Sequence, residues 1–196
     1  MKENIIMILN SGWCKGMKIK TPKGSITRPT GAKIREAFID ILQIEIRGAI
    51  FLDLFSGTGA VGLSAISRGA KGCLFVESDP HAYKALRENL QEASRRAEKQ
   101  EILCQPLSAI NKQVSKSWLD IKKHTPIDIV WADPPYEQAE QWVSDSVKDL
   151  SQIITNGGFF ALECSKESNI VLSENEWLLK KERAFGKSKL LIWQKL

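Results

Sequence analysis

The sequence predicts an α/β fold, a mostly parallel seven-stranded sheet with helices on both faces and an antiparallel strand at its C-terminal end. Short apolar runs of strand length alternate with longer segments whose apolar residues recur at helical spacing, which is typical of a parallel sheet. Near the end, residues 177–184 and 189–195 are two successive strand-like runs joined by a Phe-Gly-Lys-Ser turn. Such a terminal hairpin adds an antiparallel strand to an otherwise parallel sheet.

The length and composition indicate one globular domain of ordinary type. The chain has 196 residues, enough for a substantial core. No apolar run approaches the ~20 residues of a membrane span, and the short apolar N-terminus lacks a small-residue cleavage site, so we expect no membrane segment and no signal peptide. The cysteines show no paired metal spacing, so we expect a reducing cytoplasm and no metal; they are Cys14, Cys73, Cys104 and Cys164.

The positive charge lies at the N-terminal end. Residues 1–48 hold nine Lys or Arg against four Asp or Glu, a net charge of +5, whereas residues 49–196 hold 19 of each sign. We therefore predict a basic extension, 1–48, that faces a polyanion, followed by a neutral body, 49–196. The alternative is an ordinary solvated arm, which charge alone does not exclude.

The basic extension divides into a hairpin and a helix. Runs at 5–9 and 17–20 predict a hairpin, and a loop follows at 21–29. Thr30 suits the N-cap of a helix at 31–46, whose apolar residues recur at helical spacing. Arg28, Lys33 and Arg35 stand at its start, where cations oppose the helix dipole and would suit a bound anion, unless they are simply exposed.

Residues 49–196 then alternate between strand-like and helix-like segments. Apolar runs predict buried strands, and amphipathic stretches between them predict helices. The predicted strands are 49–55, 72–77, 101–104, 127–132 and 158–164, and the predicted helices are 60–68, 81–97, 107–119 and 137–154.

A glycine-rich turn follows the first of these strands. Gly57-x-Gly59-x-x-Gly62 matches the dinucleotide fingerprint, with Glu77 about 20 residues on, so a nicotinamide cofactor must be considered. Asp53 argues against it, because a carboxylate at the strand end repels a pyrophosphate. It suits the cationic S-adenosylmethionine, with Glu77 accepting from the ribose hydroxyls. A buried carboxylate without a partner is costly, and neither acid has an evident partner nearby in sequence.

Asp133-Pro134-Pro135-Tyr136 follows the strand at 127–132 and predicts a clamp for a flat amine. Two prolines stiffen the turn and remove two backbone donors. The Asp133 carboxylate and the Pro134 carbonyl could accept the two N–H groups of an exocyclic amine, with Tyr136 stacked on the ring. The alternative is a proline-rich loop in which Tyr136 only contributes to packing.

These motifs together resemble the class I S-adenosylmethionine-dependent methyltransferases that act on exocyclic amines. Gly12 to Ile19 and Arg28-Pro29-Thr30, followed by Ile34-Arg35-Glu36-Ala37-Phe38, resemble in particular the RsmD family of bacterial 16S rRNA guanine-N2 methyltransferases. The similarity runs from about Ile8 to Trp193. Two positions depart from the family: Gln105 stands where a small polar or acidic residue usually contacts adenine, and Tyr136 where Phe is frequent.

The resemblance implies a Rossmann-like methyltransferase fold, S-adenosylmethionine as cofactor and methyl transfer to N2 of a guanine in 16S rRNA, within the small ribosomal subunit. The implied site residues fall into three groups. They are catalytic Asp133, Pro134, Pro135 and Tyr136; cofactor-binding Asp53, Phe55, Ser56, Gly57, Thr58, Gly59, Glu77, Ser78 and Gln105; and RNA-binding Arg28, Thr30, Lys33 and Arg35.

Other functions are compatible with parts of the sequence. A DNA adenine-N6 methyltransferase shares the clamp, although the chain has no spare length for a target-recognition segment. A nicotinamide-dependent oxidoreductase shares the glycine turn, and a non-catalytic RNA-binding module would share the basic extension. We expect a cytoplasmic enzyme, monomeric by default, that acts without metal or membrane.

Overall fold

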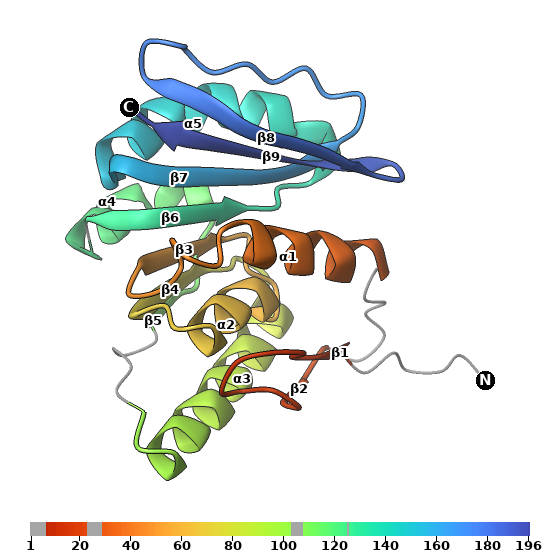
Figure 1. Ribbon diagram of the computed structural model, residues 1–196, viewed down its shortest axis with the longest axis vertical. Coiled ribbons are helices and arrows are strands. Elements are labelled where there is room, and N and C mark those ends of the chain that lie inside the picture. Colours follow the sequence, from red (N-terminus) through yellow and green to blue (C-terminus); the bar gives the residue numbers. More distant parts are fainter. Residues whose placement is uncertain (1–6, 23–28, 103–107, 125) are drawn as a thin grey trace.

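The computed structural model describes residues 7–22, 29–102, 108–124 and 126–196, and its centre is a seven-stranded sheet (Figure 1). The strand order is β5-β4-β3-β6-β7-β9-β8, and every pair is parallel except β7–β9 and β9–β8. This confirms the predicted α/β fold and its antiparallel C-terminal strand. The strands are β3 Ile50–Leu54, β4 Gly72–Val76, β5 Ser108–Ile110, β6 Ile127–Ala132, β7 Ile154–Ser165, β8 Trp177–Phe185 and β9 Ser188–Lys195.

Helices cover both faces of the sheet, as predicted. One buried apolar cluster joins α1, α2, α3 and the N-terminal hairpin to one face, and a second joins α4 and α5 to the other. In the described part of the chain, each helix is too short or too polar to cross a bilayer. The helices are α1 Pro29–Ile41, α2 Ala60–Ser67, α3 Pro80–Lys99, α4 Trp118–Ile121 and α5 Ala139–Ile153, with single 3₁₀ turns η1 Val114–Lys116, η2 Lys122–His124 and η3 Tyr136–Gln138.

Burial on both faces explains why the central strands are almost wholly apolar. Along β3, Phe51 enters the cluster beneath α1, while Leu52 and Leu54 enter the cluster on the opposite face. The alternation continues at Asp53, which replaces an apolar residue on the α1 face at the end of the strand. A carboxyl group is thereby held at the sheet edge where ligands of parallel α/β folds bind.

The third predicted strand and the helix after it were wrong. Glu101 lies in a turn with φ 55°, and the Ile102 N–H donates to the Ala97 carbonyl at 2.9 Å, closing α3. Residues 103–107, which include Cys104 and Gln105, lie outside the described residues. The strand beside β4 is the three-residue β5, which occupies the start of the helix predicted at 107–119. The short η1 and α4 follow it in place of one long helix.

The remaining elements occur where the sequence places them, with shifted ends. Helix α1 begins at Pro29, so Thr30 lies inside the helix and its assignment as the N-cap was wrong. Proline fits the first helical position because the N–H it lacks would have no partner there. The helix ends at Ile41, and turns continue to Gly48.

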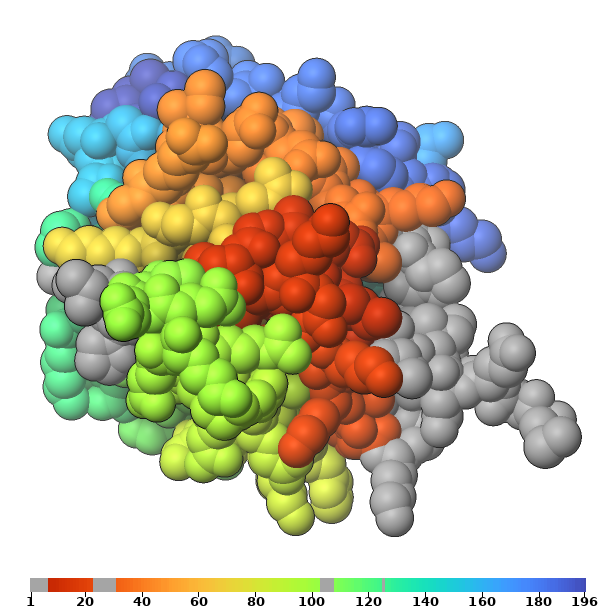
Figure 2. All heavy atoms as spheres, turned by 60° about the horizontal axis from the view of Figure 1, so that its bottom comes forward, coloured from red at the N-terminus to blue at the C-terminus, as the bar shows by residue number. Residues whose placement is uncertain are grey.

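The N-terminal hairpin pairs β1 Met7–Ile8 with β2 Lys18–Ile19, as predicted, and docks against α2 and α3 (Figure 2). The Trp13 indole N–H donates to the Ile66 carbonyl at 2.9 Å. The Lys20 N–H donates to the Asn89 side chain at 2.9 Å. Gly12 has φ 75°, and a Cβ there would lie 1.8 Å from the Ser67 carbonyl oxygen, so this turn accepts only glycine. The hairpin is therefore fixed to the neutral body, 49–196.

Candidate functional site

A hollow of about 790 Å³ lies at the carboxyl ends of β3, β4, β6 and β7. This is the edge at which parallel α/β sheets bind ligands. It brings together most of the site residues that the sequence predicts, from segments far apart in the chain. Those lining it are Asp53, Phe55, Ser56, Gly57, Thr58, Glu77, Ser78, Asp133, Pro134, Pro135, Tyr136 and Arg35.

The turn after β3 depends on left-handed backbone conformations. Gly57 and Gly59 have φ 54° and 82°, and Phe55 has φ 58° although it is not glycine. A side chain in this region carries strain that surrounding contacts must offset. The Phe55 ring packs edge-on against Trp142 with the ring centroids 5.2 Å apart. The turn therefore holds Phe55 at the rim of the hollow, and Gly59 lies behind the lining rather than in it.

Gly62 allows α2 to pack closely on the sheet. A Cβ at this position would lie 2.4 Å from the Phe75 ring and 2.6 Å from the Cys73 sulfur, both on β4. Close approach brings the first turn of α2 to the end of β3. The third glycine of the motif thus serves packing, as in dinucleotide folds, and does not itself identify a ligand.

Asp53 is buried, with 1% of its surface exposed, and it has a partner that the sequence did not reveal. Its Oδ2 accepts the Gly62 N–H at 2.8 Å, which ties β3 to the start of α2. Burial raises the pKa of Asp53 to about 8; the Gly62 N–H opposes this shift, and the negative charges of Asp133 and Glu77 add to it. No partner for Asp53 was evident nearby in sequence; the structure supplies one nine residues on, because the start of α2 lies against the end of β3.

Glu77 also has backbone partners. Its Oε2 accepts the Gly57 N–H at 2.7 Å, and its Oε1 accepts the Asp79 N–H at 2.7 Å. Each carboxylate oxygen has more than one lone pair, so both can accept a further hydrogen bond from a ligand. Glu77 therefore fixes the glycine turn while its carboxylate lines the hollow.

The Asp-Pro-Pro-Tyr segment leaves the end of β6 and enters the turn η3. Asp133 is exposed at the hollow and Pro134 is buried beneath it. The Tyr136 hydroxyl donates to Glu163 Oε1 at 3.0 Å and lies 2.6 Å from the Ser188 hydroxyl oxygen. Partial burial raises the pKa of Tyr136, the Ser188 bond opposes the shift and the Glu163 charge adds to it. The phenol is thus neutral and held by its hydroxyl end.

The cations predicted to bind RNA do not share one surface. Lys33 is exposed, whereas Arg35 is buried, with 5% of its surface exposed, and lines the hollow. Burial lowers the pKa of Arg35, and its guanidinium lies 3.2 Å from the Met7 sulfur. Arg35 is the one cation among the described residues that line the hollow. Arg28 and Gln105 lie outside the described residues.

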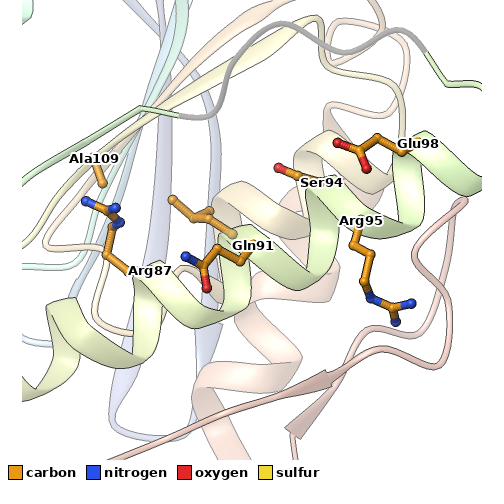
Figure 3. Close-up of a pocket in the computed structure, with 7 residues that line it drawn as sticks. Arg87, Gln91, Ser94, Arg95, Glu98 and Ala109 are labelled. Atoms are coloured by element: carbon orange, nitrogen blue, oxygen red, sulfur yellow. The ribbon is translucent and has the colours of Figure 1, made fainter.

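A second hollow, of about 520 Å³, lies along α3, away from this edge (Figure 3). Arg87 points toward Ala109 there, while Arg95 points to the other side of the helix. Arg95 is already paired with Glu92 at 2.8 Å, as is Arg96. This hollow contains none of the predicted site residues.

Sequence reasoning missed Glu163 as a site residue. It lies at the end of β7, is 5% exposed and lines the first hollow. The available signal was a carboxylate that interrupts the apolar run Phe159 to Cys164, the same signal that Asp53 gives in its own strand. Ser188, by contrast, follows a glycine turn and gives no sign of its contact with Tyr136.

Comparison with known proteins agrees with the fold. The family model described as Conserved hypothetical protein 95 matches residues 7–194. Ribosomal RNA small subunit methyltransferase D of Escherichia coli K12 is 27% identical over 194 residues, covering 97% of this chain and 90% of the relative. The protein of the same name from Haemophilus influenzae is 29% identical, covering 90% of this chain and 87% of the relative. A solved structure of the Escherichia coli protein yhhF is 25% identical, covers 96% of this chain and 97% of that chain, and has a TM-score of 0.80.

The match spans the basic hairpin, the glycine turn, the proline-rich clamp and the C-terminal strands. The chain therefore belongs to the family described as Conserved hypothetical protein 95, the RsmD family of methyltransferases.

Proposed function

We propose that the protein transfers a methyl group from S-adenosylmethionine to the exocyclic N2 of a guanine in 16S rRNA of the small ribosomal subunit. The observation that carries this proposal is that one hollow contains both the acidic glycine turn and the Asp-Pro-Pro-Tyr clamp. The curated relatives named Ribosomal RNA small subunit methyltransferase D support the class of substrate.

The residues around the glycine turn fit S-adenosylmethionine. Glu77 and Asp53, at the ends of β4 and β3, suit a cationic ligand better than a pyrophosphate, because a nearby cation favours the ionised form of the Asp53 carboxyl group and a pyrophosphate opposes it. Glu77 has lone pairs for the ribose hydroxyls, and the glycines allow the ligand to approach the backbone. When bound, this cofactor supplies an electrophilic methyl group on its sulfonium.

The clamp would orient the acceptor amine. The amino nitrogen of guanine is a weak nucleophile because its lone pair is delocalised into the ring. Hydrogen bonds from its two N–H groups to Asp133 and to the Pro134 carbonyl would aim the lone pair at the methyl group, and orientation supplies much of the rate. The Asp133 carboxylate would also stabilise positive charge that develops on the nitrogen.

The target base has to leave its stack to reach the hollow, and the Tyr136 ring offers a face for stacking. Residues 1–48 would serve as the RNA-facing extension, in which the exposed Lys33 would bind a phosphate and the buried Arg35 would act from within the hollow. The resemblance implies RNA binding for Arg28 and Thr30 as well. The turn between β8 and β9 adds Lys187 beside the same edge, because Ser188 contacts Tyr136. We propose that the protein acts as a monomer, without metal, in the cytoplasm.

The test is methyl transfer from labelled S-adenosylmethionine to small subunits that lack the modification, beside naked 16S RNA and duplex DNA. We expect N2-methylguanosine in the subunit RNA. Asp133→Ala should lower the rate by about 10²–10³-fold while cofactor affinity is kept, because only the acceptor side is changed. N6-methyladenine in the DNA would overturn the substrate, and cofactor binding without transfer to any of the three would overturn the activity.

A further inference from the structure

We propose that Glu163 determines the base specificity of the acceptor site by accepting the N1–H of guanine. The inference rests on the proposed function and extends it from the amine to the edge of the base beside it. It is carried by the position of Glu163 in the sheet, by its burial and by the contact that fixes it.

Glu163 lies level with the clamp. Strands β6 and β7 are parallel, and Ala132, the last residue of β6, pairs with Leu162. The next residues on the two strands are Asp133 and Glu163, so two carboxylates leave neighbouring strands at the same height. Both line the hollow.

The strand alternation sets the direction of the Glu163 side chain. Phe159 and Ala161 enter the core cluster beneath α1, and Leu162 enters the opposite one, so Glu163 is on the α1 face. Asp53 is on this same face of β3. In the strand order, β3 and β7 flank β6 on either side. The Asp-Pro-Pro-Tyr clamp, which follows β6, therefore lies between Asp53 and Glu163.

The Tyr136 hydroxyl fixes the Glu163 carboxylate. The hydroxyl donates to Glu163 Oε1 at 3.0 Å. This bond connects Tyr136, which would stack on the base, with Glu163, which would accept the N1–H at the edge of the base. An ionised carboxylate has about four lone-pair sites, so it can accept hydrogen bonds from more than one donor at a time. At 5% exposure, the carboxylate is well shielded from competing water.

The chemistry of the base edge explains why this matters. Guanine presents the N1–H donor directly beside its N2 amine, so a carboxylate can accept this hydrogen while Asp133 and the Pro134 carbonyl accept those of the amine. Adenine presents an unprotonated N1 beside its amine, so its lone pair would face a carboxylate that can only accept. A buried polar group left without its partner is unfavourable, so Glu163 would discriminate against bases that lack N1–H.

The test replaces the acceptor guanine, once mapped, with 2-aminopurine in reconstituted small subunits. This base keeps the 2-amino group but has an unprotonated N1. The wild-type protein should prefer guanine by at least about 100-fold in kcat/KM. Glu163→Gln should lower that ratio at least about 10-fold, because an amide can donate to N1 or accept from N1–H. 2-Aminopurine also lacks O6, but this loss is the same for the wild type and for Glu163→Gln. A difference between the two proteins in the guanine to 2-aminopurine ratio therefore reports on N1.

Ser188→Ala is the matched control, because it removes the other partner of the Tyr136 hydroxyl and keeps the carboxylate. It should leave the base ratio unchanged. An unchanged ratio in Glu163→Gln, in a variant with wild-type thermal stability and cofactor affinity, overturns the inference. If that variant transfers to neither base, the wild-type ratio decides: equal transfer to both bases also overturns it. Failure of the wild-type protein to methylate any guanine is a different result, which overturns the proposed function itself.

Discussion

The carboxyl group of Asp53 couples the stability of the fold to the chemistry of the site. It is buried, it accepts the first-turn N–H of Gly62, and its folded pKa lies near 8. A group that keeps its proton in the folded state and loses it in the unfolded chain makes stability depend on pH. A cationic ligand would favour the ionised form of this carboxyl group, so ligand binding and the protonation of Asp53 are coupled.

We predict that the ligand-free protein loses stability as the pH rises from about 4 to about 8. The unfolded chain releases the Asp53 proton near the ordinary pKa of 3.8, whereas the folded protein releases it near 8, so the folded state binds more protons in this window. Asp53→Asn removes this group and keeps an oxygen for the Gly62 N–H. Between pH 5.5 and 8, urea unfolding should show a loss on the order of 1–3 kcal/mol larger for the wild type than for the variant. Equal losses would show that Asp53 ionises as freely in the folded protein as in the unfolded chain.

Single residues were predictable where a motif fixes their backbone. The glycine turn, Glu77 and the Asp-Pro-Pro-Tyr segment all lie at the predicted edge. Partners contributed by other elements were not predictable: Gly62 for Asp53, and Glu163 and Ser188 for Tyr136. Such contacts depend on how helices and strands pack, which spacing along the chain does not encode.

At the scale of elements, close contact between α2 and β4 sets the geometry of the turn between β3 and α2. Gly62 lies against Phe75 and Cys73, so the helix lies nearer to the sheet than a side chain would allow. The N–H that reaches Asp53 belongs to this same residue. One small residue thereby connects helix packing with the electrostatics of the hollow.

Gly62→Ala should destabilise the protein by about 1–3 kcal/mol, because a rigid, buried ring and a buried sulfur block the added methyl group. Gly31→Ala is the control: nothing lies within 4 Å of a Cβ at that position in α1. It should stay within about 1 kcal/mol of the wild type. Urea denaturation of the two variants measures the difference. A Gly62→Ala protein as stable as Gly31→Ala would mean that α2 can move away from the sheet without cost.

Elements with a strong apolar pattern were predicted well, and β5 was not. The run at 101–104 has the apolar content of a strand, yet Glu101 and Ile102 close α3 by turn hydrogen bonds. The true strand, Ser108–Ile110, is only half-buried and lies at the sheet edge, so its pairing with β4 leaves no alternating pattern in the sequence. Edge strands of this length are defined by their neighbour rather than by their own residues.

For the whole molecule, the N-terminal extension is part of the core and also its most basic segment. Leu9, Cys14, Met17 and Ile19 are buried in the cluster that contains α1 and the sheet. The lysines of the hairpin and of α1 are consequently carried on a rigid surface rather than on a loose tail. A rigid surface can position phosphates relative to the hollow, which favours one acceptor base over others.

We predict that Lys33→Ala weakens RNA binding across sequences and lowers the salt slope, log Kd against log salt, by about 1, as loss of one phosphate contact requires. Lys148→Ala removes the same charge from an exposed position on α5, over the opposite face of the sheet. It should leave both affinity and slope unchanged. Titration of small-subunit RNA at several salt concentrations compares them. Equal effects of the two substitutions would assign the binding to net charge and not to the N-terminal extension.

The hydrogen bond between Tyr136 and Ser188 has a consequence for biosynthesis. Strand β9, which Ser188 begins, pairs with β7 and is flanked by β8, so a segment translated after the glycine turn and the Asp-Pro-Pro-Tyr segment completes the interior of the sheet. A nascent chain that has already formed the cofactor side still lacks the strand that secures the aromatic ring of the acceptor side. Synthesis therefore delays the assembly of the complete site until β9 has been made, and a protein shortened before β9 would retain the glycine turn without a finished clamp.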